Sequence, residues 1–330
     1  MSTEAVDPRY IEIDQWPTVT AVEAMLEGQL LAVASVRDQC QSIAEASEAI
    51  ALCLRAGGRL VYAGAGTSGR IAVQDGVELT PTYNWPPARL VFLIAGGMRA
   101  LAVGVEGAED DVLRAREEVA EHALGPNDVV IAVAASGRTP YTVAVLEAAA
   151  SRGALTIGLS NNADAALFKH ARHRLLVETG SEPVAGSTRM KAGTSQKVVL
   201  NLLSTAAMLR CGLVCKGLMV NMRISNAKLR SRANAITSRL AEVSEEAAAS
   251  ALERAAGDIR LAVLMARGLE LHLAQDLLAS ASGNLSQAIA MGASGPGSHG
   301  IGSPGHVAPM LEPGRRTPEL SRAAKRLRLE

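Results

Sequence analysis

Two short segments of the sequence combine glycines with hydroxyl side chains in a way that suits the binding of a phosphate group. The first is Gly64-Ala65-Gly66-Thr67-Ser68-Gly69, which follows an apolar run and precedes a helix-like stretch. A glycine turn between a strand and a helix lets backbone N–H groups approach an anion at the positive end of the helix. The segment therefore predicts an anion site in which Gly66, Thr67 and Ser68 take part.

This segment is spelled G-x-G-x-x-G, like a dinucleotide-binding loop, but the rest of that pattern is missing. A dinucleotide site needs an Asp or Glu at the end of the next strand to hold the ribose. The next apolar run, residues 90–94, is followed by Ala95-Gly96-Gly97-Met98, without an acidic residue. The Lys-Ser/Thr pair that closes a nucleotide triphosphate loop is also missing. A small phosphate ester is therefore favoured over NAD.

The second segment, Ala134-Ala135-Ser136-Gly137-Arg138-Thr139-Pro140, repeats the layout of the first after the apolar run 129–133. Pro140 suits a first helical turn, and Thr139 either caps that helix or contacts a ligand. In α/β sheets, ligands bind at the carboxyl ends of the strands. The two loops therefore predict one cleft for a single phosphate, held by Ser68, Ser136, Gly137 and Thr139, and no magnesium carboxylates accompany them.

The elements around these loops predict an α/β layered domain with a mostly parallel, five-stranded sheet flanked by helices, because short apolar runs alternate with helix-like stretches. Strands are expected near 59–64, 90–95, 128–134, 154–159 and 173–178, and helices near 19–56, 68–78, 110–123, 139–152 and 191–214.

This pattern divides the chain into four regions. They are a helical segment over 1–56 that packs on the core, the phosphate-binding domain over 57–221, a helical subdomain over 222–290, and a disordered tail over 291–330, which is rich in Gly, Pro and Ser.

Composition narrows the class of partner. The net charge is zero, which gives no general attraction to nucleic acid or to an anionic membrane. The N-terminus lacks the apolar segment of a signal peptide. The apolar stretch around 198–220 is interrupted by Asn201, Arg210 and Lys216, so we expect a core helix there rather than a membrane span. No histidine or further cysteine lies at zinc-ligand spacing from Cys211 and Cys215. We expect a cytoplasmic protein without a metal or another cofactor.

From Thr3 to about residue 290 the chain resembles the N-acetylmuramic acid 6-phosphate etherases, a family built on the sugar isomerase (SIS) domain. The parts that carry the resemblance are GAGTSGR, Asp75-x-x-Glu78 with Pro81-Thr82, LIAGG at 93–97, VEGAED at 105–110, AASGRTPY, and GSTRMKAGTSQK at 186–197. The resemblance implies a SIS-type fold and a homodimer with active sites at the subunit boundary. It also implies cleavage of the D-lactyl ether of N-acetylmuramic acid 6-phosphate, as a step in cell-wall sugar recycling.

Glu78 and Glu109 match the two catalytic glutamates of that family. The resemblance implies that Glu78 protonates the departing lactate oxygen and then activates water, and that Glu109 transfers the C2 proton. It indicates which two residues are catalytic more strongly than it indicates which role each one has. From the residues alone, Glu78 could be a solvated residue at a helix end. Glu109 could be an acidic residue that favours the start of a helix for electrostatic reasons.

The segment GSTRMKAGTSQK precedes a long apolar helix and offers three further candidates. Ser187 and Thr188 could contact the sugar or cap the helix, and Lys191 could contact an anion or stabilise the loop. Arg70 and Arg138 each follow a loop glycine, where an arginine could contact the phosphate or form a salt bridge.

The sequence departs from the family's usual pattern close to the proposed acid. Gly76, Val77 and Leu79 stand where Ala, Ser and Cys are usual, Asn84 replaces a glycine, and Met98 replaces an acidic residue. These changes could alter which ether or sugar is preferred.

An aldose–ketose phosphate isomerase and a non-catalytic sugar-phosphate sensor remain the alternatives, whereas a transcriptional regulator would need a basic helix-turn-helix that the acidic N-terminal segment lacks.

Overall fold

Five short strands form one all-parallel sheet in the order β2-β1-β3-β4-β5, which confirms the predicted α/β class. The computed structural model describes residues 3–293. The strands are β1 (Leu60–Gly64), β2 (Leu90–Ile94), β3 (Val129–Val133), β4 (Leu155–Ser160) and β5 (His173–Leu176). Every residue of β1, β3 and β4 is buried, as expected for a parallel sheet with helices on both faces.

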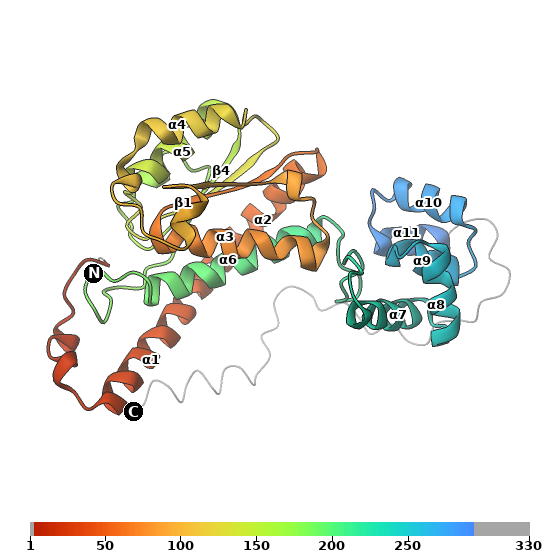
Figure 1. Cartoon of the computed structure of the whole chain (residues 1–330), viewed down its shortest axis with the longest axis horizontal. Coiled ribbons are helices and arrows are strands. Elements are labelled where there is room, and N and C mark those ends of the chain that lie inside the picture. Colours follow the sequence, from red (N-terminus) through yellow and green to blue (C-terminus); the bar gives the residue numbers. More distant parts are fainter. Residues whose placement is uncertain (1–2, 294–330) are drawn as a thin grey trace. The chain divides into compact units, whose positions relative to one another are not determined.

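Helices cover both faces of this sheet (Figure 1). One face packs against α2 (Cys40–Arg55), α3 (Gly66–Tyr83) and α6 (Lys191–Arg210), and the other against α4 (Val112–Glu121) and α5 (Pro140–Ser151). Side chains alternate along each strand, so that Tyr62 and Ile131 enter the first layer while Val61 and Val130 enter the second. Single 3-10 turns connect these elements, at Pro8–Tyr10, Ile13–Gln15, Val36–Gln39, Pro87–Arg89, Met98–Leu101 (η5), Ala108–Asp110 (η6) and Ala166–Lys169.

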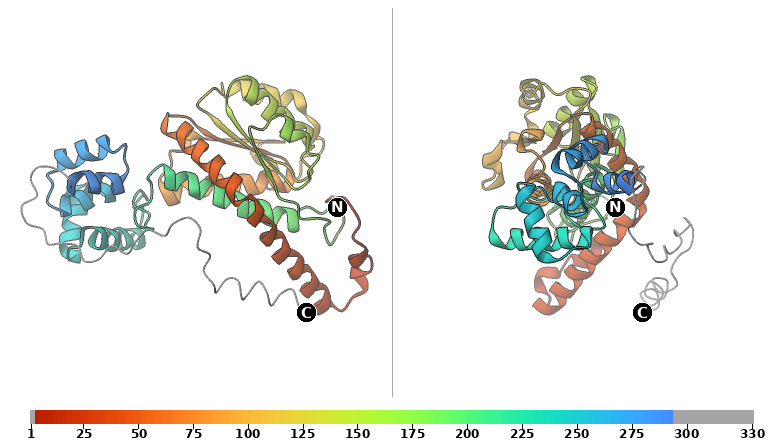
Figure 2. Two further views of the ribbon diagram at one scale, coloured as in Figure 1. Left: turned by 180° about the vertical axis from the view of Figure 1, so that it is seen from behind. Right: turned by 90° about the vertical axis from the view of Figure 1, so that its right-hand side faces the viewer.

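The helix expected over 19–56 is divided in two. It consists of α1 (Thr18–Ser35) and α2, joined by the 3-10 turn Val36–Gln39. The apolar side chains of α2 are buried against the sheet, whereas α1 contacts α6 and continues beyond the sheet (Figure 2). Its residues Val22, Leu26 and Leu30 are each more than half exposed. By length and composition alone, residues 18–55 form the one helical stretch in the described part of the chain that could cross a membrane.

The helices after residue 220 form a separate hydrophobic cluster. They are α7 (Ala227–Ala241), α8 (Glu245–Arg254), α9 (Ile259–Ala266), α10 (Leu271–Ser280) and α11 (Leu285–Ala293). Buried residues such as Leu240, Leu252 and Val263 belong to this cluster and to neither layer of the sheet. The C-terminal helical region is therefore present as predicted. The tail expected over 291–330 lies outside the described residues except for 291–293, which end α11.

The structure explains one departure from the family pattern. Gly76 lies inside α3 against the aromatic rings of Tyr62 and Phe92, whose centroids are 6.0 Å apart. A Cβ atom at Gly76 would lie 2.6 Å from Phe92 Cε1 and 2.8 Å from Tyr62 Cε2. Alanine, the usual residue, therefore does not fit here, because this chain places two aromatic rings in the space that its methyl group needs.

We expect Gly76→Ala to lower the free energy of unfolding by roughly 1–2 kcal/mol, although alanine is the better helix former. The overlap with the two rings outweighs the gain in helix propensity of about 1 kcal/mol. Urea unfolding of Gly76→Ala, Phe92→Leu and the double variant measures this. The double variant should be destabilised by less than the sum of the single changes; a Gly76→Ala protein as stable as the wild type contradicts the packing argument.

Candidate active site

The two predicted phosphate loops begin at the same edge of the sheet. Gly64 at the end of β1 pairs in register with Val133 at the end of the neighbouring strand β3. Adjacent strands lie about 5 Å apart, so the loops that continue from them start side by side. The structure therefore brings together the two segments that the sequence marked as halves of one site.

In the first loop, α3 begins with backbone groups that no side chain caps. The N-cap residue is Ala65, and Gly66 adopts a left-handed φ of 53°. The first N–H groups of a helix have no partner inside the helix, and Ala65 has no side chain that could accept from them. Ser68 lies in this first turn and is 8% exposed. The helix start thus offers N–H donors and a hydroxyl to an anion.

In the second loop, the hydroxyl of Thr139 is not used as a helix cap. Thr139 occupies the N-cap position of α5, but its side chain accepts no hydrogen bond from the first turn. Ser136 Oγ accepts a hydrogen bond of 3.2 Å from the N–H of Arg138. Gly137 has a φ of 66°, and an added Cβ would lie 2.1 Å from Ala165 Cβ. The arginine that follows, Arg138, forms an exposed ion pair with Asp164.

A polar segment after β4 holds the second loop, and sequence reasoning did not identify it. The carbonyl oxygen of Ala135 accepts hydrogen bonds from Asn162 Nδ2 at 2.8 Å, from the N–H of Asn161 at 3.0 Å and from Ser160 Oγ at 3.2 Å. Asn162 also donates to Thr3 Oγ1 at 3.0 Å. Three consecutive polar residues, the last of a buried strand and the two after it, at the same edge as the predicted phosphate loops, are the signal that could have revealed this support.

The start of α6 is capped by Glu182 rather than by Ser187 or Thr188. The Glu182 carboxylate is fully buried and accepts hydrogen bonds of 2.9 Å from the N–H groups of Lys191 and Ala192. An added Cβ at Gly193 would lie 3.3 Å from the carbonyl oxygen of Thr188 and 3.6 Å from Thr67 Cγ2. The turn that carries Thr188 therefore lies beside the first phosphate loop.

Lys191 is 4% exposed, and its Nζ donates a hydrogen bond of 2.8 Å to the carbonyl oxygen of Ser181. Burial lowers the pKa of Lys191, and the negative charge of Glu182 opposes that change. The lysine thus stabilises the loop before α6. Contacts of Lys191, Ser187 and Thr188 with a substrate remain predictions.

Glu109 lies in η6, next to the first phosphate loop. It lines a cavity of about 330 Å³ together with Gly66, Arg70 and Glu106. Asp111, not Glu109, caps α4, because Asp111 Oδ1 accepts a hydrogen bond of 2.9 Å from the N–H of Arg114. Glu109 is exposed, and its carboxylate is not needed to start the helix. It is therefore available for chemistry in this cavity.

Glu78 occupies an exposed position in the interior of α3, which runs past Pro81 to Tyr83 and not only to 78 as expected. Glu78 is twelve positions after Gly66, so it lies about 18 Å along the helix axis from the first phosphate loop. One chain thus places Glu109 beside that loop and Glu78 well away from it.

A buried carboxylate one turn before Glu78 fixes this part of α3. Asp75 is 2% exposed and accepts hydrogen bonds from Tyr62 Oη at 2.7 Å, Asn201 Nδ2 at 2.6 Å and Ser204 Oγ at 3.2 Å. These bonds tie α3 to β1 and α6. Burial and the charge of Asp75 raise the pKa of Tyr62, so the phenol remains a donor at neutral pH.

The N-terminal segment is anchored to the loop before α6 through Asp7. Its carboxylate is buried and accepts hydrogen bonds from Ser181 Oγ at 2.9 Å and from the guanidinium and backbone N–H of Arg9. The Arg9 side chain holds the pKa of Asp7 well below its usual range. Because the folded pKa is lowered, the stabilisation is present above the ordinary pKa of 3.8 and is lost as the pH falls further.

We therefore expect Asp7→Asn to lower the free energy of unfolding at pH 7 by roughly 1.5–3 kcal/mol, the value of hydrogen bonds to a charged group. The difference from the wild type should narrow as the pH falls below about 3.8. Urea unfolding between pH 7 and pH 2.5 measures it, with Asp14→Asn, an exposed aspartate on the same segment, as the control. A difference that stays constant with pH contradicts the role of the ionised carboxylate.

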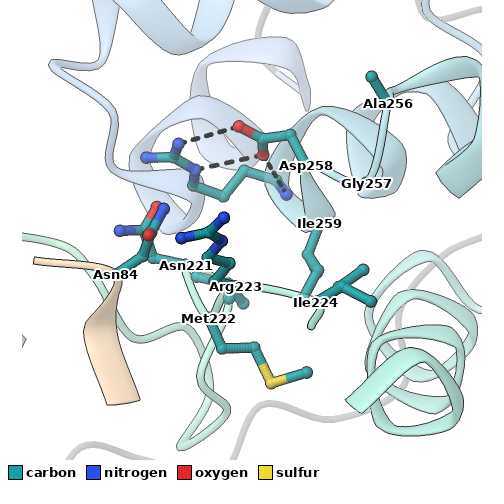
Figure 3. A pocket seen from close by; sticks show the side chains of 11 residues that line it. Asn84, Asn221, Met222, Arg223, Ile224, Ala256, Gly257, Asp258 and Ile259 are labelled. Carbon is teal, nitrogen blue, oxygen red and sulfur yellow. Dashed lines mark hydrogen bonds and ion pairs between the residues drawn. The ribbon is translucent and has the colours of Figure 1, made fainter. Parts of the chain in front are cut away.

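A cavity of about 360 Å³ lies elsewhere in the described chain, lined by Asn84, by residues 220–224 and by residues 256–260 (Figure 3). Asp258 caps α9 there and pairs with the Arg260 guanidinium at 2.9 Å. None of the predicted catalytic or phosphate-binding residues lines this cavity. It includes Asn84, one of the departures from the family pattern, but neither phosphate loop.

Two family models match parts of this chain. The model of the glucokinase regulatory protein N-terminal SIS domain matches residues 42–150, and that of the SIS domain matches residues 114–206. A phosphoheptose isomerase structure from Neisseria gonorrhoeae is 15% identical, with a TM-score of 0.45 over 58% of this chain and 98% of that one.

Sequence relatives are much closer. An N-acetylmuramic acid 6-phosphate etherase of Deinococcus radiodurans is 43% identical over 88% of this chain and 95% of its own length. An etherase of the same name from Streptomyces coelicolor is also 43% identical, over 88% of this chain and 94% of its own. With this identity over nearly the whole length of both relatives, the chain belongs to the N-acetylmuramic acid 6-phosphate etherase family.

Proposed function

We propose that this protein cleaves the D-lactyl ether of N-acetylmuramic acid 6-phosphate, giving N-acetylglucosamine 6-phosphate and D-lactate in cell-wall sugar recycling. The observation that carries the proposal is the placement of Glu109 in a cavity that Gly66 of the first phosphate loop also lines. A sugar phosphate held by the two loops would therefore have a carboxylate base within the same cavity. Membership of the etherase family supports the choice of substrate.

The reaction needs an acid and a base but consumes only water. Opening of the sugar ring gives an aldehyde at C1, which acidifies the C2 proton. Glu109 removes this proton, the C3–O bond breaks, and the lactate oxygen leaves with a proton from Glu78. Glu78, now a carboxylate, activates a water that adds to C3, and Glu109 returns a proton to C2. The sum is one water added and no net oxidation, so two carboxyl groups suffice.

A phosphate held at the helix start orients the sugar for these steps. Backbone N–H groups at Gly66 and hydroxyls of Ser68, Ser136 and Thr139 provide neutral donors, which suit a single phosphate ester. We propose that Thr67 and Gly137 shape the two loops and that Ser187 and Thr188 reach the sugar from the turn beside Thr67. The division into domains at about residues 56, 221 and 290 is part of the same proposal.

We further propose a cytoplasmic homodimer with active sites at the subunit boundary. Two observations support it: Glu78 lies far along α3 from the loop of its own chain, and α1 leaves an apolar surface at Val22, Leu26 and Leu30. A second copy that covers α1 would remove this surface from water and could bring its own acid to the site.

The dimer is tested with Leu26→Glu combined with Leu30→Glu. We expect wild-type protein to sediment as a dimer and the double variant as a monomer with lactate release reduced at least about tenfold, because two charges in an apolar interface oppose association. Leu113→Glu, on the exposed side of α4, is the matched control and should change neither property. An active wild-type monomer, or wild-type protein that partitions into vesicles, contradicts the proposal.

The function itself is tested by incubating purified wild-type protein with N-acetylmuramic acid 6-phosphate and measuring D-lactate with a lactate dehydrogenase. Release of D-lactate together with N-acetylglucosamine 6-phosphate in equal amounts supports the etherase. Formation of a ketose phosphate without lactate indicates the isomerase, and tight binding without any product indicates the sensor. Either of these results overturns the proposal.

A further inference from the structure

Arg70 stands out among the residues that line the cavity of Glu109. It lies on α3 one turn after Gly66, is half-buried, and faces the same cavity of about 330 Å³ as Glu106 and Glu109. Its Nε donates a hydrogen bond of 3.0 Å to the carbonyl oxygen of Ala100 in η5. Within residues 3–293 it forms this bond and no ion pair, so the two terminal nitrogens of the guanidinium have no carboxylate partner.

The corresponding arginine of the second loop behaves differently. Both loops contain Ser-Gly-Arg, as Ser68-Gly69-Arg70 and as Ser136-Gly137-Arg138. Arg138 is exposed and its charge is neutralised by Asp164. Arg70 is more buried, yet its only described partner is a neutral carbonyl. Because Arg70 uses only its Nε in the described bond, the N–H groups of its two terminal nitrogens stay available to an anionic group of a ligand.

The charges in the cavity indicate what kind of ligand this is. Arg70 is the single cation among the residues that line it, and Glu106 and Glu109 are the two anions. The phosphate of a sugar ester is already served by the N–H groups and hydroxyls of the two loops. The planar fork of an arginine matches a carboxylate, which it can bind through two parallel hydrogen bonds.

We infer that Arg70 binds the carboxylate of the lactyl group, and so selects an ether that carries an acid over an ether that does not. The inference rests on the proposed function. Glu109 acts on C2, and the lactyl oxygen is attached to the adjacent carbon C3, so the lactyl group must lie in the cavity that Glu109 and Arg70 share. The bond to Ala100 holds the guanidinium in one orientation while its outer nitrogens receive the carboxylate.

The test compares N-acetylmuramic acid 6-phosphate with its carboxamide, in which the lactyl acid is replaced by a neutral amide of the same shape. Both give N-acetylglucosamine 6-phosphate, whose release is the common readout for kcat and KM. We expect wild-type protein to prefer the acid by about 10- to 100-fold in kcat/KM. The Arg70→Met substitution should lower kcat/KM for the acid by that factor, mainly by raising KM. It should change kcat/KM for the amide by less than about threefold.

Arg70→Lys keeps the charge but not the fork, and should recover only part of the preference. Arg99→Met removes an exposed arginine from η5 and is the matched control, with no change expected on either substrate. Equal losses on acid and amide in Arg70→Met would show that Arg70 acts only by holding Ala100, and would overturn the inference. No loss on either substrate would overturn it as well.

Failure of the proposed function gives a different result. In that case wild-type protein cleaves neither ether, and the same two compounds are compared by equilibrium binding. Tighter binding of the acid that disappears in Arg70→Met then supports the role of Arg70 in recognising a carboxylate. Equal binding of acid and amide by the wild type overturns it.

Discussion

Glu109→Gln is expected to lower kcat for lactate release by about 10²- to 10⁴-fold, the usual contribution of a positioned acid or base. Glutamine has the same shape but cannot accept the C2 proton. The turn that carries residue 109 should be unchanged, because the left-handed Gly107 and the Asp111 cap define it without the Glu109 side chain. KM should change little, since the phosphate loops are untouched.

Two controls make this prediction specific. Glu106→Gln removes the other carboxylate of the same cavity and should retain most of the activity. Exchange of the C2 hydrogen with deuterium from the solvent separates the two roles: Glu109→Gln should lose the exchange, whereas Glu78→Gln should retain it while releasing no lactate. If Glu106→Gln is inactive and Glu109→Gln is not, the base has been assigned to the wrong glutamate. Exchange lost only in Glu78→Gln would reverse the roles.

Glu182→Ala is expected to have the largest effect on stability, with a loss of about 3–5 kcal/mol in the free energy of unfolding. The substitution removes a fully buried carboxylate that accepts two hydrogen bonds from the first turn of α6. It leaves two N–H groups without an acceptor and the buried Lys191 ammonium without the neighbouring negative charge. Because Thr188 precedes this turn, the phosphate site should weaken as well.

Urea unfolding measures the loss, and two further variants identify its cause. Glu182→Gln should be destabilised less than the alanine variant, because one amide oxygen can still accept from the helix start. Adding Lys191→Met to Glu182→Ala should restore part of the stability, because it removes the uncompensated charge. The capping explanation is wrong if Glu182→Ala lowers the free energy of unfolding by less than about 1 kcal/mol. It is also wrong if Lys191→Met destabilises the Glu182→Ala protein as much as it destabilises the wild type.

The fold could be predicted from the sequence because its strands are short apolar runs separated by helix-like segments. Local signals also marked the loops after β1 and β3 and the helix start at Thr139, whereas phosphate binding by these loops stays a prediction. The division between α1 and α2 was missed, because neither glycine nor proline marks the 3-10 turn at Val36–Gln39. The end of α3 was placed too early, because Pro81 is accommodated within its last turn and the left-handed Asn84 ends the helix.

The residues that support the site escaped prediction for a different reason. Glu182, Asn162 and Asp75 act on partners that are distant in the sequence or belong to another element, such as Ala135 for Asn162 and Asn201 for Asp75. No local pattern identifies which buried polar side chain will meet which backbone group. The catalytic pair came from the resemblance to the etherase family, and the geometry adds that a single chain separates the two glutamates.

The attachment of Thr3 has a practical consequence for anyone who labels or immobilises this protein. Thr3 is fully buried, its N–H donates to Asn162 Oδ1 at 3.1 Å, and the same asparagine supports the second phosphate loop. A fusion partner or affinity tag joined before residue 1 would be attached within three residues of the contact between Thr3 and Asn162. Strain at this junction would be passed to the second loop through Asn162, which contacts both Thr3 and Ala135. Kinetic constants obtained with an amino-terminal tag should therefore be checked against those of the cleaved protein.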